Sequence, residues 1–287
     1  MKVGFVGVGA MGNHMATHVM VRGKHEVYVF DLDKAAANRM KKKGAKVSRS
    51  LKEMGGNCDV VIIMVGYDHQ VRQVVTDLSV GSKKGQIIVI TATSHPDMIL
   101  ECVAIAKKGG KKILDAPVCF GLDGAEDGTL VSTVGGEKAD FDKAKPVLDC
   151  YSRMAAHVGA HGCGELGKTI NNMLHWVHSI ANQEVLLLGK VYGINPKKMR
   201  KLLLQMPGTN GTLDRWDGTR FTWQEKDLDI ALDLAQRRNL PLPLFGSVDQ
   251  LIKFSNHHQV ADLLNTKKIE YMGRTLKAAP PGKDVKK

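Results

Sequence analysis

Five polar side chains recur at helical spacing between residues 164 and 189. They are Lys168, Asn172, His175, Ser179 and Asn182, and at about 3.6 residues per turn they fall on one face of a helix. The positions between them are mostly apolar, so the segment predicts one long helix with a polar stripe. Such a stripe can be a solvated face. Lys168 suggests a second interpretation, because the positive end of the helix dipole disfavours an ammonium in the first turn, and a lysine held there can work as an acid or a base.

The chain begins with a strand pattern, a glycine-rich turn and a helical pattern. Residues 2–6 are apolar, and Gly7-Val8-Gly9-Ala10-Met11-Gly12 follows as G-x-G-x-x-G. In this context the first glycine permits a tight turn, the second lets the backbone approach a pyrophosphate, and the third lets the helix pack on the strand. The N-terminus of the helix would face the phosphates. The sequence therefore predicts a dinucleotide site that includes Gly7, Gly9, Ala10, Met11 and Gly12.

A second strand pattern, residues 26–30, ends at Asp31, which lies 19 positions after Gly12. A carboxylate at this place accepts hydrogen bonds from the ribose hydroxyls of the adenosine and repels a 2′-phosphate. The next residues, Leu32-Asp33-Lys34, include no arginine. We therefore predict that the chain uses NAD, with NADP the less favoured cofactor. The alternative for Asp31 is a helix N-cap for the segment that follows.

Apolar runs alternate with helical patterns up to residue 162. Near-continuous apolar runs of this kind indicate a parallel sheet that is covered on both faces. We expect an α/β fold, a Rossmann-type doubly wound sheet over residues 1–162. The expected strands are 45–47, 59–65, 86–91, 112–116, 130–134 and 155–158, and the expected helices are 35–43, 68–78, 96–107 (with Ser94 as a possible cap) and 141–148.

The second half of the chain reads as a helical domain. The long interdomain helix, residues 164–189, enters an all-α domain that we place at 163–277. Further helices are expected at 197–205, 226–238, 244–254 and 260–276. Residues 278–287 are rich in Pro, Gly and Lys and are expected to be a disordered tail.

Composition narrows the classes of protein that fit. The chain has 287 residues and a formal net charge of +12. The lysine clusters are not interleaved with aromatic residues, which favours a solvated basic surface over a nucleic-acid site. The five cysteines are scattered without a CxxC pattern, so neither a disulfide framework nor a zinc knuckle is indicated, and a cytoplasmic location fits. We expect no signal peptide, no membrane span and no metal site.

Four stretches together resemble one family. They are GFVGVGAMG at the N-terminus, the run Asp115-Ala116-Pro117-Val118-Cys119-Phe120-Gly121 with Gly124-Ala125 and Gly128-Thr129-Leu130 after it, the G-x-x-x-K-x-x-N-N segment at 164–172, and Lys226-Asp227-Leu228. In this order and spacing they resemble the β-hydroxyacid dehydrogenases, the group that contains 3-hydroxyisobutyrate dehydrogenase and tartronate semialdehyde reductase. The related 6-phosphogluconate dehydrogenases carry His where Asn171 stands, so they fit less well.

The resemblance implies roles for particular residues. Lys168 would be the general acid/base, and Asn172 would orient the substrate. The cofactor would be contacted by Thr93 and Lys226 near the nicotinamide and by Val65, which with Gly66 replaces the family's Leu-Pro after the fourth strand. The family also implies a homodimer or homotetramer built through the helical domain.

The substrate loop departs from the family pattern. The family's Ser-Gly-Gly, which holds the substrate carboxylate, is Cys119-Phe120-Gly121 here. A thiol is a weak donor, and Phe120 adds bulk where the backbone approaches the ligand. The substrate would then be larger or aromatic, or its acid would be held in another way, or Phe120 would only pack. His175 replaces an apolar residue and is either a substrate contact or a packed or solvated histidine.

These observations predict an NAD-dependent oxidoreductase that transfers a hydride between nicotinamide and a β-hydroxyacid or its semialdehyde. One alternative is a dehydrogenase for a bulkier or aromatic substrate. Another is a non-catalytic dinucleotide-binding protein with a basic surface for nucleic acid or a protein partner. Lys168 and Asn172 argue against the last, since non-catalytic relatives tend to lose the lysine. The residues do not name the substrate, because the loop that should select it is the part that departs.

Overall fold

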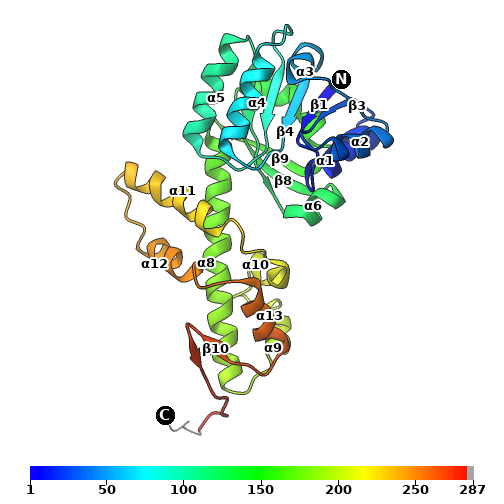
Figure 1. Ribbon diagram of the computed structural model, residues 1–287. Coiled ribbons are helices and arrows are strands. Elements are labelled where there is room, and N and C mark those ends of the chain that lie inside the picture. Colours follow the sequence, from blue (N-terminus) through cyan, green and yellow to red (C-terminus); the bar gives the residue numbers. More distant parts are fainter. Residues whose placement is uncertain (283–287) are drawn as a thin grey trace. The chain divides into compact units, whose positions relative to one another are not determined.

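The computed structural model describes residues 1–282 (Figure 1). The chain forms two compact units, the first over residues 1–168 and the second from residue 169 onward. The long helix α8 (Cys163–Val191) begins in the first unit and continues through the second. It includes the whole helix expected at 164–189. The domain boundary that we place after residue 162 stays a prediction.

The first unit is built on one mixed sheet. Its strands are β1 (Lys2–Val6), β2 (Glu26–Phe30), β3 (Lys46–Val47), β4 (Val60–Ile63), β5 (Ile87–Ile90), β6 (Lys112–Asp115), β7 (Val118–Cys119), β8 (Leu130–Gly136) and β9 (Ser152–Gly159). The order is β3-β2-β1-β4-β5-β6-β8-β7, with β9 beside β8. The first six strands in this order are parallel, in the arrangement typical of a dinucleotide-binding sheet. The expected fold class is confirmed, although β8 runs antiparallel to both β6 and β7.

Helices cover both faces of this sheet because successive strand residues point to opposite sides. In β4, Val60 and Ile62 pack in one apolar cluster and Val61 and Ile63 in the other. The first cluster includes residues of α1, α2, α6 and α7, and the second includes residues of α3, α4 and α5. The helices are α1 (Gly12–Val21), α2 (Lys34–Lys42), α3 (Leu51–Asn57), α4 (Asp68–Ser79), α5 (Pro96–Lys108), α6 (Gly121–Asp127) and α7 (Lys138–Leu148).

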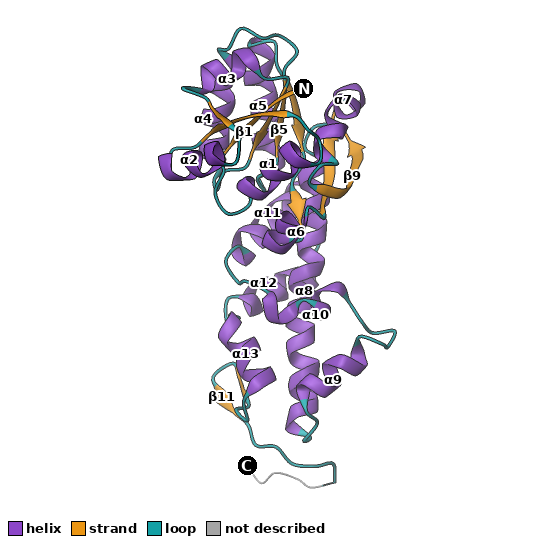
Figure 2. Cartoon of the chain, turned by 90° about the vertical axis from the view of Figure 1, so that its right-hand side faces the viewer, coloured by secondary structure: helices purple, strands orange, loops and turns teal. Residues whose placement is uncertain are grey.

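In the second unit, shorter helices lie along α8 (Figure 1, Figure 2). Trp176 and Ile180 of α8 pack in one apolar cluster, and Leu186 and Leu187 pack in another with the buried Trp216. The remaining elements are α9 (Pro196–Leu203), α10 (Gly211–Asp214), the 3-10 turn η1 (Trp216–Gly218), α11 (Gln224–Arg237), α12 (Pro243–Ile252), α13 (His257–Asn265), β10 (Glu270–Tyr271) and β11 (Arg274–Thr275).

The expectation of one helix over 260–276 is wrong in its second half. Helix α13 ends at Asn265, and β10 and β11 form a short antiparallel hairpin. Met272 and Gly273 join these strands with φ values of +47° and +74°. Two consecutive residues with positive φ are what a tight hairpin turn requires, and a helix cannot contain them. The helical domain that we expected therefore carries a small hairpin at its end.

Other local expectations also need correction. The N-cap of α5 is His95, whose side chain accepts the backbone N–H of Asp97 at 3.1 Å, so Ser94 is not the cap. Helices α3 and α6 and strand β7 were not expected, since each is short and two of them are rich in glycine. Of the tail expected to be disordered, residues 283–287 lie outside the described residues. Ala279 donates a backbone hydrogen bond of 2.8 Å to Val191.

Candidate active site

The glycine-rich turn has the geometry that a dinucleotide site needs. Gly7 has a φ of +86°, and a Cβ there would overlap the carbonyl oxygen of Met64. A Cβ on Gly12 would overlap the carbonyl oxygen of Gly7, so the third glycine lets α1 start against the turn. At Gly9 an added Cβ would meet no atom within 4 Å, which leaves open space beside the backbone.

The N-terminus of α1 is suited to an anion. It has no side-chain cap and no acidic residue in its first turn. The first amides of a helix have no partner within the helix, and they carry the positive end of its dipole. The residues present here therefore fit the pyrophosphate of a dinucleotide.

Asp31 ties the end of β2 to this turn. Its two carboxylate oxygens accept the backbone N–H groups of Val8 at 2.7 Å and of Asp33 at 2.8 Å. The N-cap of α2 is Asp33, so the alternative role of Asp31 as that cap is wrong. A carboxylate has about four acceptor positions, which leaves capacity for ribose hydroxyls.

The other expected cofactor residues of the first unit lie at the same edge of the sheet. Val65 follows β4, and its Cγ1 atom would lie 3.3 Å from a Cβ on Gly7. Thr93 follows β5 and is half-buried. Strands β1, β4 and β5 are parallel neighbours, so their carboxyl ends meet at one edge. Because β2 lies on one side of β1 and β4 on the other, this edge includes the point where the strand order reverses, where such sheets bind their ligands.

Lys168 lies against the substrate loop. Its Nζ donates a hydrogen bond of 2.9 Å to the carbonyl oxygen of Val118 and lies 3.6 Å from Cys119 Sγ. Two glycines of α8 allow this approach. A Cβ on Gly164 would overlap the carbonyl oxygen of Asp115, and one on Gly167 would lie 2.8 Å from Thr133 Oγ1. The structure thus brings together Lys168 and Cys119, which lie 49 positions apart.

Two buried carboxyl groups lie at the start of α8. Asp115, at the end of β6, accepts the backbone N–H groups of Gly162 and Glu165, each at 3.0 Å. Burial raises the pKa of Asp115, and these N–H donors oppose the rise. Burial also raises the pKa of Glu165 well above its usual range, and the nearby Asp115 adds to this effect. We did not expect a functional role for either residue, although the acidic Glu165 three positions before Lys168 was a visible signal.

Phe120 has an unusual backbone conformation. Its φ is +84° and its ψ is 3°, in the left-handed region, and it immediately precedes α6. This region is strained for a bulky residue, and such strain tends to occur at functional sites. The guanidinium carbon of Arg153 lies 4.4 Å from the centre of the Phe120 ring. Gly121 follows with a φ of +58°, so the three residues that replace the family's Ser-Gly-Gly join the end of β7 to the start of α6.

The polar stripe of α8 is not the solvated face that we considered. Asn172, Ser179 and Asn182 are all buried. Ser179 Oγ donates to the carbonyl oxygen of His175 at 2.9 Å, and the Asn182 and Asn210 side chains exchange hydrogen bonds of 3.2 and 2.9 Å. These contacts give Ser179 and Asn182 a structural role in the second unit.

Three expected site residues belong to the second unit. Asn172 Oδ1 accepts a hydrogen bond of 3.1 Å from Asn171 Nδ2. His175 Nδ1 lies 3.1 Å from Thr212 Oγ1, within hydrogen-bond distance. Lys226 Nζ lies 5.7 Å from the centre of a tryptophan ring in the turn before α11. Their approach to the cofactor and to Lys168 stays a prediction.

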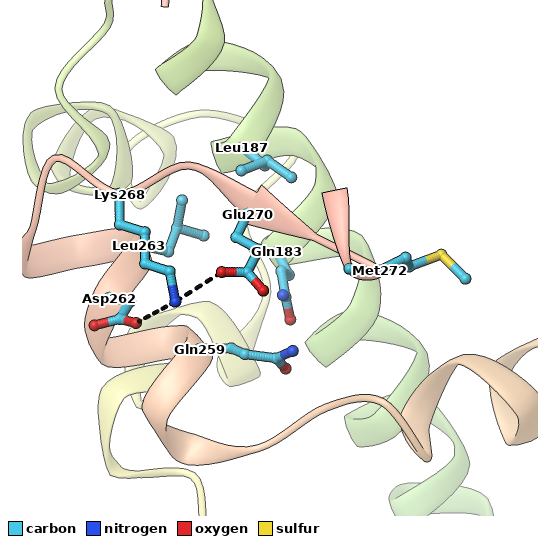
Figure 3. A pocket seen from close by; sticks show the side chains of 9 residues that line it. Gln183, Leu187, Gln259, Asp262, Leu263, Lys268, Glu270 and Met272 are labelled. Carbon is cyan, nitrogen blue, oxygen red and sulfur yellow. Dashed lines mark ion pairs between the residues drawn. The ribbon is translucent and has the colours of Figure 1, made fainter. Parts of the chain in front are cut away.

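A separate small cavity, of about 70 Å³, lies within the second unit (Figure 3). Its lining includes Gln183 and Gln259 together with an ion-paired lysine. The Lys268 ammonium lies 2.7 Å from a Glu270 carboxylate oxygen and 3.7 Å from one of Asp262. Neither Lys168 nor any residue of the glycine-rich turn contributes to the lining of this cavity.

Two general findings concern the part of the chain that is described. In residues 1–282, no group of three or more His, Cys, Asp or Glu side chains could hold a metal ion. Over the same range, every helix is too short or too polar to cross a membrane.

Comparisons with known proteins agree with this arrangement. A family model described as the NAD binding domain of 6-phosphogluconate dehydrogenase matches residues 2–159. A second model, described as NAD-binding of NADP-dependent 3-hydroxyisobutyrate dehydrogenase, matches residues 162–272. The chain is 32% identical over 272 residues to a probable mitochondrial 3-hydroxyisobutyrate dehydrogenase of Dictyostelium discoideum, covering 87% of this chain and 84% of that protein.

Two further relatives extend the comparison. The 2-(hydroxymethyl)glutarate dehydrogenase of Eubacterium barkeri is 30% identical over 266 residues, which is 88% of each chain. The solved structure of a 3-hydroxyisobutyrate dehydrogenase of Mycobacterium tuberculosis with L-serine superposes with a TM-score of 0.80 at 27% identity, covering 88% of this chain and 92% of that one. The glycine-rich turn, the strand order and these matches lead to one conclusion: the chain belongs to the β-hydroxyacid dehydrogenase family and is an NAD-binding oxidoreductase that acts on CH–OH groups.

Proposed function

We propose that Lys168 is the general acid/base of this oxidoreductase and that its substrate is a β-hydroxyacid or the corresponding semialdehyde. The observation that carries the proposal is the position of the Lys168 amine, 2.9 Å from Val118 O and 3.6 Å from Cys119 Sγ. An amine at the surface of the substrate loop is placed to take a proton from a substrate hydroxyl in the oxidation, or to give one to the carbonyl oxygen in the reduction.

The bound nicotinamide would accept or supply the hydride, and this chain's residues do the rest. The turn at Gly7, Gly9 and Gly12 and the carboxylate of Asp31 would hold the dinucleotide at the carboxyl edge of the sheet. Ala10, Met11, Val65, Thr93 and Lys226 would complete its contacts. Asn172, one helical turn beyond Lys168, would orient the substrate oxygen.

Phe120 bears on the size of the substrate. Its ring has a partner within the protein, since the Arg153 guanidinium stacks over it. This contact favours a packing role for Phe120 over a direct contact with an aromatic substrate. We therefore place small β-hydroxyacids first, as in relatives named 3-hydroxyisobutyrate dehydrogenase, and bulkier or aromatic substrates second.

The test is a panel of candidate substrates. Oxidation of 3-hydroxyisobutyrate, L-serine, 2-(hydroxymethyl)glutarate and an aromatic 3-hydroxyacid is followed by NADH absorbance, with NAD and NADP in parallel. We expect turnover of at least one small β-hydroxyacid with NAD. Turnover of the aromatic acid alone would instead support a bulkier or aromatic substrate. An absence of turnover on every hydroxyacid of the panel, with NADH binding intact, would contradict the proposed activity.

We also propose a homodimer or homotetramer that assembles through α8. Five large apolar side chains of this helix are exposed in the single chain, with exposed fractions between 43% and 60%: Leu166, Ile170, Leu174, Val185 and Leu188. Exposed apolar residues at helical spacing favour burial against another subunit. Light scattering should give a dimer or larger mass, and Leu174→Glu with Leu188→Glu should lower it. A monomeric wild-type protein would contradict this proposal.

Finally, we propose that the protein works in the cytoplasm. All five cysteines are free thiols, which fits a reducing compartment. Cell fractionation with an antibody to the native protein tests this location.

A further inference from the structure

Helix α6 continues directly from the substrate loop, because it begins at Gly121 and has Phe120 as its N-cap residue. Two small residues of this helix, Gly124 and Ala125, are buried, and its other residues are exposed or half-buried. Short helices are marginal by themselves and depend on tertiary contacts. With so little buried apolar area, the position of α6 depends on the polar contacts at its ends.

The carboxyl end of α6 is held by Arg22, the C-cap residue of α1. The Arg22 guanidinium donates hydrogen bonds of 2.7 Å to the carbonyl oxygen of Asp127 and of 3.0 Å to that of Gly128. A third bond, of 3.4 Å, reaches the carbonyl oxygen of Cys150 after α7. The last carbonyl groups of a helix have no partner within it and carry the negative end of its dipole, so a cation with five N–H donors suits this place. Gly128 allows the approach, since a Cβ there would overlap the guanidinium.

Two histidines of α1 add contacts with the same end of α6. His18 Nε2 lies 2.8 Å from the carbonyl oxygen of Glu126, and His14 Nε2 lies 3.7 Å from its carboxylate. Because His14, His18 and Arg22 are four positions apart, their side chains share one face of α1. Helices α1 and α6 accordingly lie side by side (Figure 1). Since α1 begins at Gly12, it connects the dinucleotide turn to the end of α6.

Backbone hydrogen bonds within α6 connect this held end to the substrate loop. The Gly124 N–H donates to the carbonyl oxygen of Phe120 at 3.2 Å, and the Gly124 carbonyl oxygen accepts the N–H of Thr129 at 2.8 Å. Gly124 also lies close to Phe120, since a Cβ added to Gly124 would be 2.6 Å from the Phe120 Cβ. A displacement of the carboxyl end of α6 would therefore move Phe120.

We propose that Arg22 is a positioning residue that holds the substrate loop in place by fixing the carboxyl end of α6 to α1, with His18 in support. The loop residue Cys119, which precedes Phe120, has its Sγ 3.6 Å from the Nζ of Lys168. The proposal rests on the proposed function of Lys168 and this loop, and it adds a residue that acts on substrate binding through the loop. Arg22 is not proposed to touch the substrate or the cofactor.

The first experiment measures steady-state kinetics of Arg22→Met, which keeps a long apolar stem and removes every donor. The substrate must then select the ordered loop from a larger ensemble, so its apparent affinity falls with the population of that state. We expect KM for the hydroxyacid to rise about tenfold, the effect of one charge-assisted hydrogen bond, with kcat and the Kd of NADH within about twofold of wild type. A KM equal to that of wild type overturns the proposal.

The matched control is Lys24→Met, which removes a positive charge at an exposed position two residues after Arg22. This variant should leave KM, kcat and NADH binding unchanged. A general loss of folded protein lowers kcat and leaves KM as it is, so a rise in KM separates positioning from destabilisation. Arg22→Lys keeps the charge but loses the planar fork of donors, so its KM should lie between those of wild type and Arg22→Met.

The second experiment measures the hold on α6 without turnover, by hydrogen exchange of a peptide that covers this helix. Its amides exchange through local opening, so in Arg22→Met their rate should rise about tenfold, by the same free energy as KM. Peptides of α4, which packs on the other face of the sheet, should exchange as in wild type. Unchanged exchange of α6 overturns the hold by Arg22. Faster exchange with an unchanged KM overturns its effect on substrate binding.

Folding is checked for each variant by circular dichroism and NADH binding. If Arg22→Met does not fold, Arg22→Lys decides the proposal, and wild-type values of both KM and the exchange of α6 in that variant overturn it.

The two proposals fail separately. An active enzyme that depends on Lys168, but whose KM and α6 exchange do not change in Arg22→Met, leaves the proposed function intact and removes the role of Arg22. Faster exchange of α6 in Arg22→Met, in a protein without activity on the substrate panel, supports the hold on the loop and contradicts the proposed function.

Discussion

The Nζ of Lys168 donates a hydrogen bond of 2.9 Å to the carbonyl oxygen of Val118, in the strand that leads into the substrate loop. The contact joins the second turn of α8 to a segment 50 positions earlier in the chain. It is possible because Gly164 and Gly167 let the helix approach β6 and β8 closely. The amine is thereby held at the loop whose sequence departs most from the family pattern.

Lys168→Ala should abolish most of the activity while leaving the dinucleotide site intact. General acid–base catalysis contributes about 10²–10⁴-fold, so kcat should fall by about this factor. NADH binding, measured by fluorescence, should stay close to wild type. Lys197 is exposed in the first turn of α9, so Lys197→Ala is the matched control and should be fully active. Near-wild-type turnover by Lys168→Ala would rule out the proposed mechanism.

Asp31→Asn should raise the use of NADP relative to NAD. The amide keeps an acceptor for the Val8 N–H, which lies 2.7 Å from the carboxylate, and removes the negative charge that would repel a 2′-phosphate. The measurement is the ratio of kcat/KM for the two cofactors, and a ratio equal to that of wild type would count against the assignment. Asp97→Asn, at an exposed carboxylate in the first turn of α5, is the control.

Asp115→Ala should destabilise the first unit more than Asp115→Asn does. Asp115 accepts two backbone N–H groups at the start of α8, and alanine leaves both without this acceptor. Loss of such a cap costs about 1–2 kcal/mol, and asparagine retains part of it. Urea unfolding measures the free energies of the three proteins. Equal stability of the two variants would show that the cap contributes little.

Phe120→Gly should be more stable than Phe120→Ala. Both changes remove the ring and its contact with Arg153, but only alanine keeps a Cβ at a φ of +84°. The left-handed region costs a residue with a Cβ about 1–2 kcal/mol. Alanine usually makes a protein more stable than glycine does, by about 0.4–1 kcal/mol, because it lowers the conformational entropy of the unfolded chain. The cost of the left-handed region opposes this gain. Thermal unfolding compares the variants, and a more stable alanine variant would mean that the turn relaxes out of the left-handed region.

Lys111 should make the stability depend on pH in the alkaline range. Its Nζ is buried and donates to the carbonyl oxygens of Gly55 and Lys83 at 2.5 and 2.6 Å, and burial lowers the pKa of Lys111 to about 8, with Lys84 and Lys83 adding to the effect. The ordinary pKa of a lysine is about 10.4. Between these values the unfolded chain binds a proton that the folded chain has lost, so stability rises with pH across this window.

The comparison for Lys111 is with Lys111→Met, which cannot titrate. The difference in unfolding free energy between wild type and Lys111→Met should change in favour of wild type from pH 8 to pH 10. Lys107→Met, at an exposed lysine of α5, should show no such change relative to wild type. If the difference in unfolding free energy between wild type and Lys111→Met stays constant with pH, then Lys111 titrates alike in the folded and unfolded chains.

Local patterns were sufficient for the elements with a strong periodic signal. The glycine turn, the apolar strands β4 and β5 and the long helix α8 follow from spacing that is independent of the rest of the chain. The hairpin β10–β11 and the short helix α6 do not. Both depend on residues in the left-handed backbone region, Met272 in the hairpin and Phe120 before α6. Neither residue type is typical of that region, so the sequence did not predict it.

Candidate site residues divide in the same way. The sequence by itself determined the dinucleotide turn, because its glycines stand at short spacing, and four motifs along the chain carried the resemblance to the family and the prediction for Lys168. Only the tertiary structure decided that Val118 and Cys119 meet the Lys168 amine, that Asp115 caps α8, and that Glu165 is buried beside the lysine. The physical reason is that these contacts join residues about 50 positions apart, and they form only when α8 packs on the sheet. The spacing of residues along the chain does not contain the geometry of that packing.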